Sequence, residues 1–303
     1  MMTLLTWESE NLIVWELTKT RSRLAIYYCG KSNENQKQML EQCSLFLSSY
    51  FGLEVDIFEA FDSIDIEDSS FTLDDNVYDI TVWNKTNSHC KTGGQSKKRR
   101  KKLATVVDTV DVFSLFDVLV HAEKSPYAAI IGIFDCFLGE LKDEESLTYG
   151  EVIYHEVLGR ACGNRVACVS LPHCEYNLKT LLCTIIHELL HTVGFDHCNS
   201  YRCVVNAISS TDWLFLSPVN LRKLICIHTE RSIQDRPLLL RRKKEEDVAN
   251  QEAMFVIERY TKLMHILEAW NKQESEGLYL KEVSWLQKKI ELVSMLYQLE
   301  SHA

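Results

Sequence analysis

The hydrophobic and polar positions in the first third of the chain switch between strand and helix patterns. RLAIYYC and LEVDIF are short apolar runs that are typical of buried strands. The stretch between them, QKQMLEQCSLFLSSYFG, has helical spacing, with an apolar side made of Met39, Cys43, Phe46 and Tyr50. Gly52 follows as a C-terminal stop. These elements predict a β-α-β unit with parallel strands and a right-handed crossover.

The middle of the chain repeats this alternation around one strongly apolar strand. DTVDVFSLFDVLVHAEKS predicts a helix with Asp108 or Thr109 as its N-cap. YAAIIGIFDCFLG is apolar on both faces, which indicates a central strand of a sheet. NRVACVSLP predicts another strand, ended by Pro172. NLKTLLCTIIHELLHTVG predicts a helix of about five turns.

A charged region interrupts this order. DSIDIEDSSFTLDDNVYDITVW is acidic and then strand-like, and an insertion loop follows at about 84–104. This loop contains six consecutive basic residues, Lys97 to Lys102, and we expect it to be exposed to solvent. The alternative is a nuclear-import or nucleic-acid patch.

Two long amphipathic helices are expected near the C-terminus, after an irregular stretch that runs to about Leu224. Their apolar positions keep a 4-3-4-3 spacing, at Val256, Tyr260, Leu263, Leu267 and Trp270, and at Leu286, Ile290, Val293 and Tyr297. Two such helices can bury each other as a hairpin on the core, which favours a monomer. A self-association seam is the alternative.

Composition narrows the class of protein. The chain has 303 residues, and its hydrophobic content of 46% argues against disorder. The formal net charge of -10 disfavours general binding of phosphate backbones, so no nucleic-acid partner is expected. The N-terminus lacks the basic region of a secretory signal, and no apolar run is long enough to span a bilayer. No membrane association is therefore expected.

The cysteines point to a reducing compartment. There are eleven, an odd number, and several lie inside apolar runs, as Cys183 does in LLCTII. Such thiols are typical of small core residues rather than of a disulfide framework. We therefore expect an intracellular protein, cytoplasmic and, if the basic run acts in import, nuclear.

The stretch HELLHTVGFDH carries the candidate chemistry. His187 and His191 are four residues apart, so on a helix their rings share one face and can bind one ion. Gly194 allows the chain to reverse, and His197 can return as a third ligand. Three ligands leave one position open for water, which is typical of catalytic zinc, and Glu188 is placed to act as general base.

The full motif is a more specific signal for zinc binding than its first five residues, HExxH, alone. HExxH alone occurs by chance on many helices, and HEVLGR at His155 is an HE pair that has no partner histidine four residues on. Gly194 and His197 at the expected offsets favour zinc binding over two unrelated histidines on an amphipathic helix.

The full pattern HExxHxxGxxH is that of the metzincins, and HELLHTVGFDHCNSYRC resembles the archaemetzincin family. That family's longer pattern is HExxHxxGxxHCx4CxM followed by CPxC, and LSPVNLRKL is similar to its CPxC-LRKL segment. The resemblance implies an α+β zincin fold: a mixed twisted sheet, an active-site helix and a mainly helical C-terminal part. It also implies a catalytic Zn2+ on His187, His191 and His197, with Glu188 as base.

The resemblance assigns Cys198 and Cys203 to half of a second, four-cysteine zinc site, but this sequence departs from the pattern. Ser217 and Asn220 stand where the other two cysteines belong, and a hydroxyl and a neutral amide are poor zinc ligands. We therefore expect two buried thiols and no second zinc ion. The alternative is that Cys226 and His228 complete a Cys3His site.

Two further departures lie close to the catalytic motif. Val205 replaces the methionine that underlies the zinc histidines in metzincins, and valine is shorter and stiffer. Leu190 replaces a glycine that is frequent in the family. The replaced methionine is a packing element rather than a ligand, so these changes bear on catalysis more than on metal binding.

The sequence thus predicts a zinc-dependent metallopeptidase that acts on a peptide or protein substrate. The resemblance implies aminopeptidase-like activity on short peptides, with NRVACVSLP as the edge strand beside the cleft. Residues 1–194 and 195–303 are expected to form two subdomains of one catalytic domain. The alternative is a noncatalytic, zinc-stabilised binding or regulatory protein.

Overall fold

The computed structural model describes most of the chain. The described residues are 22–31, 33–61, 64–73, 75–84, 108–122, 126–141, 154–162, 165–199, 201–207, 212–233, 245–273 and 277–300. The predicted basic loop lies outside them apart from Asn84, which ends a strand, and so do all of Lys97 to Lys102.

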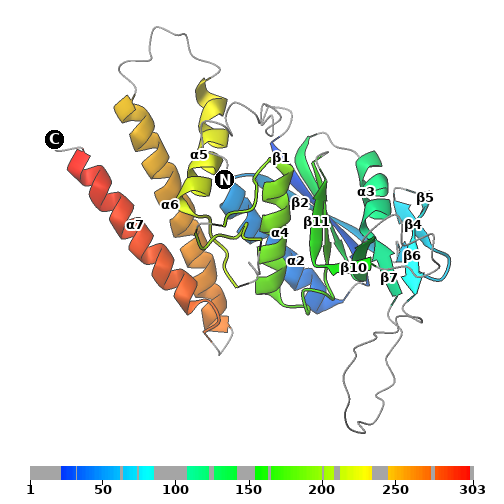
Figure 1. Ribbon diagram of the computed structural model, residues 1–303. Coiled ribbons are helices and arrows are strands. Elements are labelled where there is room, and N and C mark those ends of the chain that lie inside the picture. Colours follow the sequence, from blue (N-terminus) through cyan, green and yellow to red (C-terminus); the bar gives the residue numbers. More distant parts are fainter. Residues whose placement is uncertain are drawn as a thin grey trace, which may run out of the picture.

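A five-stranded mixed sheet forms the centre of the molecule (Figure 1). Its strand order is β11-β12-β8-β1-β2, and β11 alone runs antiparallel to its neighbour. The strands are β1 (Arg23–Gly30), β2 (Glu54–Phe61), β8 (Tyr127–Phe134), β11 (Gly159–Cys162) and β12 (Val166–Ser170). Every residue of β8 is buried, as its central position requires.

The predicted β-α-β unit is confirmed, with α2 (Glu34–Phe51) between the parallel strands β1 and β2. Asn33 caps the helix by accepting a hydrogen bond from the backbone N–H of Gln36, and Gly52 ends it at φ 64°.

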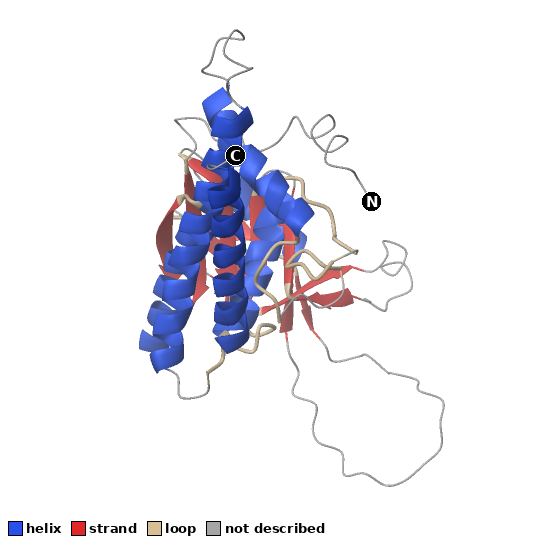
Figure 2. Ribbon diagram, turned by 90° about the vertical axis from the view of Figure 1, so that its left-hand side faces the viewer, coloured by secondary structure: helices blue, strands red, loops and turns tan. Residues whose placement is uncertain are grey.

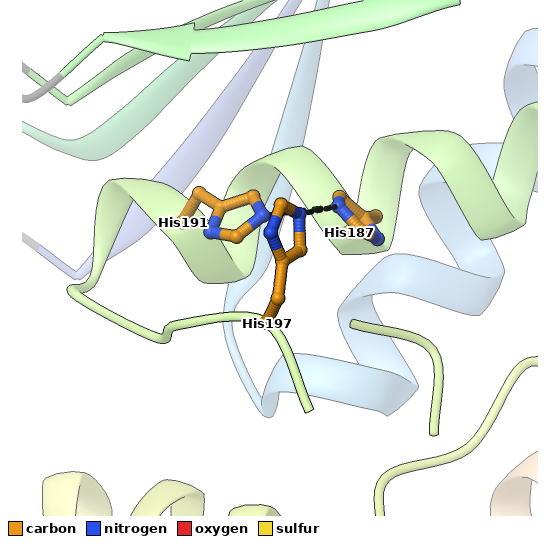
Figure 3. Close-up of side chains that lie close together, drawn as sticks. All are labelled: His187, His191 and His197. Carbon is orange, nitrogen blue, oxygen red and sulfur yellow. Dashed lines mark hydrogen bonds between the residues drawn. The ribbon is translucent and has the colours of Figure 1, made fainter. Parts of the chain in front are cut away.

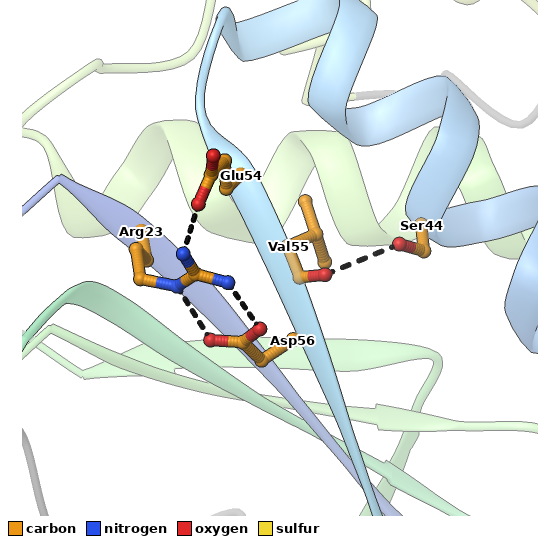
Figure 4. Close-up of polar contacts among 5 residues, drawn as sticks. All are labelled: Arg23, Ser44, Glu54, Val55 and Asp56. Atoms are coloured by element: carbon orange, nitrogen blue, oxygen red, sulfur yellow. Dashed lines mark hydrogen bonds and ion pairs between the residues drawn. The ribbon is translucent and has the colours of Figure 1, made fainter.

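Side chains reinforce the start of this unit (Figure 4). Arg23 forms ion pairs with Glu54 and Asp56 across the two strands. The Ser44 hydroxyl of α2 donates to the Val55 carbonyl at 3.4 Å. These contacts stabilise the register of β1 against β2 and the position of α2 against β2.

Helices cover both faces of the main sheet (Figure 1). On one face lie α2 and α4 (Leu178–Thr192), whose apolar residues join one large core with the C-terminal helices. On the other face, α3 (Val112–His121) forms a second core with two small sheets. The large core combines residues from both sides of position 194.

The two small sheets lie beyond α3, on the side away from the C-terminal helices (Figure 1). The four-stranded sheet contains β6 (Val82–Asn84), β7 (Asp108–Asp111), β9 (Phe137–Leu141) and β10 (Tyr154–Val157). The three-stranded sheet contains β3 (Ile64–Asp65), β4 (Ser70–Leu73) and β5 (Asn76–Asp79).

One predicted helix start and one predicted irregular stretch are wrong. The N-cap of α3 is Asp111, whose carboxylate accepts the Ser114 N–H, because residues 108–111 are strand β7, paired with β6 and β9. The chain is not irregular to Leu224, because α5 (Pro218–Ile233) begins six residues earlier. Proline is favoured at the first helical position, where its missing N–H costs nothing.

The C-terminal helices α6 (Glu245–Gln273) and α7 (Leu280–Glu300) form the expected hairpin (Figure 2). The five apolar positions predicted for α6 are all buried. In α7, Leu286 is buried, Ile290 and Val293 are half-buried against the core, and the side chain of Tyr297 lies outside the described residues. Buried Arg259 donates from Nε to the Tyr50 carbonyl at the end of α2, at 2.6 Å. The hairpin is thereby attached to the core.

The predicted α+β class is confirmed: a mixed sheet carries the motif helix, and the C-terminal part is mainly helical. The nine cysteines whose side chains are described are all free, consistent with their interpretation as core thiols. No helix among the described residues combines the length and the apolar character needed to cross a bilayer.

Candidate metal centre

Helix α4 places His187 and His191 on successive turns of one face. Asn177 caps its N-terminus by accepting the Thr180 N–H, and the opposite face is buried in the large core. The helix ends at Thr192, and Gly194 takes φ 80°, a left-handed conformation in which a side chain is strained. This turn sends the chain back toward the two histidines.

The returning chain brings the third histidine to the other two (Figure 3). The Nε2 atom of His187 lies 3.0 Å from Nε2 of His191 and 3.3 Å from Nε2 of His197. One ligand atom from each ring lies within 4.8 Å of the others. The structure therefore brings together the three predicted ligands, from a helix and the loop that follows it.

Two backbone carbonyls set the tautomers of the rings. The Nδ1–H of His187 donates to the Val204 carbonyl at 2.8 Å, and that of His191 to the Phe195 carbonyl at 2.6 Å. Nε2 of both rings then carries the lone pair that a metal needs. Burial lowers the pKa of His187, and it lowers that of His191 to about 4 with a contribution from neighbouring His187. Both rings are therefore neutral, as metal binding requires.

Glu188 lies on the side of α4 that faces strand β11. Its residue is 8% exposed, and burial raises its pKa to about 8, while Arg160 acts in the opposite direction. A Cβ atom at Gly159 would lie 2.9 Å from Cγ of Glu188 and 2.9 Å from Cγ2 of Thr184. Only glycine lets the strand approach the helix this closely, so Gly159 helps to enclose the carboxylate.

The edge strand beside the motif helix is not the one predicted, although both β11 and β12 contact α4. NRVACVSLP forms β12, which is interior to the sheet because β11 and β8 flank it. The edge strand on this side of the sheet is β11, which begins with the last two residues of HEVLGR, the stretch that showed no metal motif. Sequence reasoning missed Gly159, although a glycine inside a short strand can signal close backbone approach.

The turn at Val205 orients the site through its backbone. The Val204 carbonyl holds His187, and the Val205 carbonyl accepts the Cys198 N–H at 2.8 Å. The Val205 side chain is 0% exposed and belongs to the large core. The position of the family's methionine is therefore well packed here with valine.

The four positions at which the resemblance places a second metal site, predicted here to be lost, also come together. The Cys203 sulfur accepts the Ser217 backbone N–H at 3.2 Å and an Asn220 side-chain N–H at 3.5 Å. The Cys198 thiol donates to the Ser217 hydroxyl at 3.7 Å. The group has two thiols and two neutral oxygen or nitrogen side chains, which fits zinc poorly. The side chains of Cys226 and His228, the predicted substitutes, lie outside the described residues.

Comparisons with known proteins add little to this geometry. No model of a known protein family matches the sequence, and no curated protein matches it. Archaemetzincin from Methanopyrus kandleri is 18% identical, over 70% of this chain and 97% of its own, with a TM-score of 0.41. A zinc-dependent peptidase from Methanocorpusculum labreanum is 12% identical, over 66% and 99%, with a TM-score of 0.38. At these TM-scores neither likeness decides what this chain does, and the site rests on its own residues.

Proposed function

We propose that this protein is a zinc-dependent peptidase that hydrolyses amide bonds. The observation that carries the proposal is the convergence of three histidine rings, with one ligand atom of each within 4.8 Å of the others. In two of these rings, Nδ1–H donates to a backbone carbonyl, so that Nε2 faces the shared point. Three histidines are a ligand set of catalytic zinc, which leaves a coordination position open. Zn2+ is therefore the cofactor that these residues fit.

Each residue of the site has a distinct task. His187, His191 and His197 hold the ion, and a zinc ion there supplies Lewis acidity and lowers the pKa of water. Glu188 takes the proton from the attacking water and passes it to the leaving amine. Its pKa of about 8 belongs to the metal-free protein. A divalent cation nearby favours the ionised carboxylate, which is the form that acts as a base.

Strand β11 is the place where we expect an extended peptide to bind. It is one of the two edge strands of the described five-stranded sheet and lies directly against α4 at Gly159. A peptide can pair with the backbone of such an edge, which positions a scissile bond over the neighbouring helix. Aminopeptidase-like cleavage of short peptides is the finer form of this proposal, and the free buried thiols support an intracellular setting.

The test is to replace Glu188 by glutamine in zinc-loaded protein. Glu188→Gln keeps the size of the side chain and the three ligands, so zinc content should stay near one ion per chain. Loss of general-base catalysis should lower peptide hydrolysis by about 10²- to 10⁴-fold. Glu41→Gln, an exposed glutamate of α2, is the matched control. Unchanged turnover in Glu188→Gln would remove Glu188 from the mechanism.

A noncatalytic, zinc-stabilised binding protein is the second candidate. Ser217, Asn220 and Val205 favour it, because each departs from the pattern of the active family. It predicts that zinc raises the melting temperature while a broad peptide library stays uncleaved. Cleavage that is lost in Glu188→Gln would exclude this candidate.

A further inference from the structure

A polar cluster lies beside the third histidine, and we call Cys198, Cys203, Ser217 and Asn220 the thiol cluster. Cys203, Ser217 and Asn220 are all buried, with the Cys203 residue 1% exposed. The four side chains come from the loop that carries His197 and from the start of α5. The cluster therefore joins the His197 loop to the start of α5.

The hydrogen bonds of the cluster occupy the atoms that a metal would need. The Cys203 sulfur accepts two N–H donors, from the Ser217 backbone and the Asn220 amide. The Ser217 hydroxyl accepts the Cys198 thiol hydrogen. A closed zinc site needs four strong ligands, usually thiolates or imidazoles, and two thiols with a hydroxyl and an amide do not supply them.

We propose that the thiol cluster is a metal-free clamp that holds the His197 loop against α5, with hydrogen bonds to Cys203 in the place of a metal ion. The clamp itself is independent of peptidase activity. Its effect on the histidines rests on the proposed zinc site.

Backbone hydrogen bonds connect the thiol cluster to the histidines. Cys198 follows His197 directly, and its N–H donates to the Val205 carbonyl at 2.8 Å. The preceding residue, Val204, accepts from His187 and donates its own N–H to the Phe215 carbonyl at 2.9 Å. Movement of the Cys203 turn would therefore shift the support of His187 and the loop of His197 together.

The first experiment measures metal without the histidine site. In His187→Ala/His191→Ala protein, purified with zinc present, we expect less than 0.1 zinc ion per chain by elemental analysis. One zinc ion per chain in this variant would overturn the metal-free clamp. This result does not depend on whether the wild-type protein cleaves peptides.

The second experiment converts the clamp into a metal site. Ser217→Cys/Asn220→Cys, added to the same background, supplies four thiols around one point and should bind one zinc ion per chain. Cobalt in its place should give strong thiolate charge-transfer absorption. A folded variant that binds no metal would contradict the convergence of the four positions. The first and third experiments decide the proposal if this variant does not fold.

The third experiment tests whether the clamp positions the zinc ligands. Cys203→Ala removes the shared acceptor and should weaken zinc binding at the histidines at least tenfold, whereas Cys203→Ser, which still accepts hydrogen bonds, should recover part of the affinity. Cys43→Ala, in the equally buried core of α2, is the control for general destabilisation. Equal zinc affinity in Cys203→Ala and Cys43→Ala would refute the positioning role. Wild-type protein that binds no zinc would refute the proposed function and leave the first two experiments valid.

Discussion

Each of the two half-buried histidines of the motif donates to a carbonyl that lies outside the motif's defining positions. His187 is held by Val204, seventeen residues later, and His191 by Phe195. The spacing of the histidines follows from helix geometry and is readable in the sequence. The orientation of the rings follows from a turn that returns to the helix only in the folded protein, so no local pattern could reveal it.

Gly159 offers a test at the scale of a single residue. Gly159→Ala places a Cβ 2.9 Å from side-chain atoms of both Glu188 and Thr184, so strand or carboxylate must move. We expect peptide hydrolysis to fall at least tenfold and the free energy of unfolding to fall by about 1–3 kcal/mol, as for other overpacked sites. Zinc content should not change. Kinetics and urea unfolding measure these effects, and neighbouring Leu158→Ala, at a more exposed position, is the control. Full activity with unchanged stability would contradict the close approach.

Val205 offers a second test, of the packing beneath the site. Its side chain is fully buried, so Val205→Met inserts a longer side chain into a filled core. We expect a loss of about 1–3 kcal/mol in the free energy of unfolding, measured in urea. Val77→Met, at an exposed position of β5, should change it by less than about 0.5 kcal/mol. A more stable Val205→Met protein would show that the core has room for methionine.

At the scale of elements, prediction succeeded where the signal is local. The β1-α2-β2 unit has a buried strand at each end and a helix with both caps in its own sequence. Prediction failed for β7, which has four residues and pairs with β9, a strand more than twenty residues away. It also failed for the sheet edge, because the neighbours of β12 are set by pairing and not by its own apolar pattern.

The C-terminus of α2 gives a prediction at this scale. Gly52 has φ 64°, where a side chain costs about 1–2 kcal/mol. Gly52→Ala should therefore lower the free energy of unfolding by about 1 kcal/mol, read from thermal or urea unfolding. Glu41→Ala, on the exposed side of the same helix, should change it by less than about 0.5 kcal/mol. Equal values for the two variants would argue against the left-handed cap.

At the scale of the whole molecule, the C-terminal hairpin supports the motif helix α4. Glu282 at the start of α7 forms an ion pair of 2.7 Å with Lys179 in the first turn of α4. The two side chains are 2% and 17% exposed, respectively. On the same hairpin, Arg259 is bonded to the end of α2. The two helices that cover one face of the sheet are thus both tied to the hairpin.

This arrangement predicts an asymmetric effect of breaking the buried pair. Glu282→Ala leaves Lys179 without its carboxylate in a largely buried position and should cost about 3 kcal/mol of unfolding free energy. Adding Lys179→Met should restore part of that loss. Glu258→Ala breaks the exposed pair with Lys262 and should cost no more than about 1 kcal/mol. The pair is unimportant for stability if Glu282→Ala costs no more than Glu258→Ala.

The sequence by itself determined the α+β class, the β-α-β unit, the motif helix and its three histidines with Glu188. These features depend on the spacing of residues within one element or across a single turn, and this spacing can be read directly from the sequence. Only the tertiary structure decided that β11 lies against Glu188 at Gly159, and that the thiol cluster forms beside His197. These contacts join segments that are far apart in the chain, and sheet pairing and core packing alone bring them together.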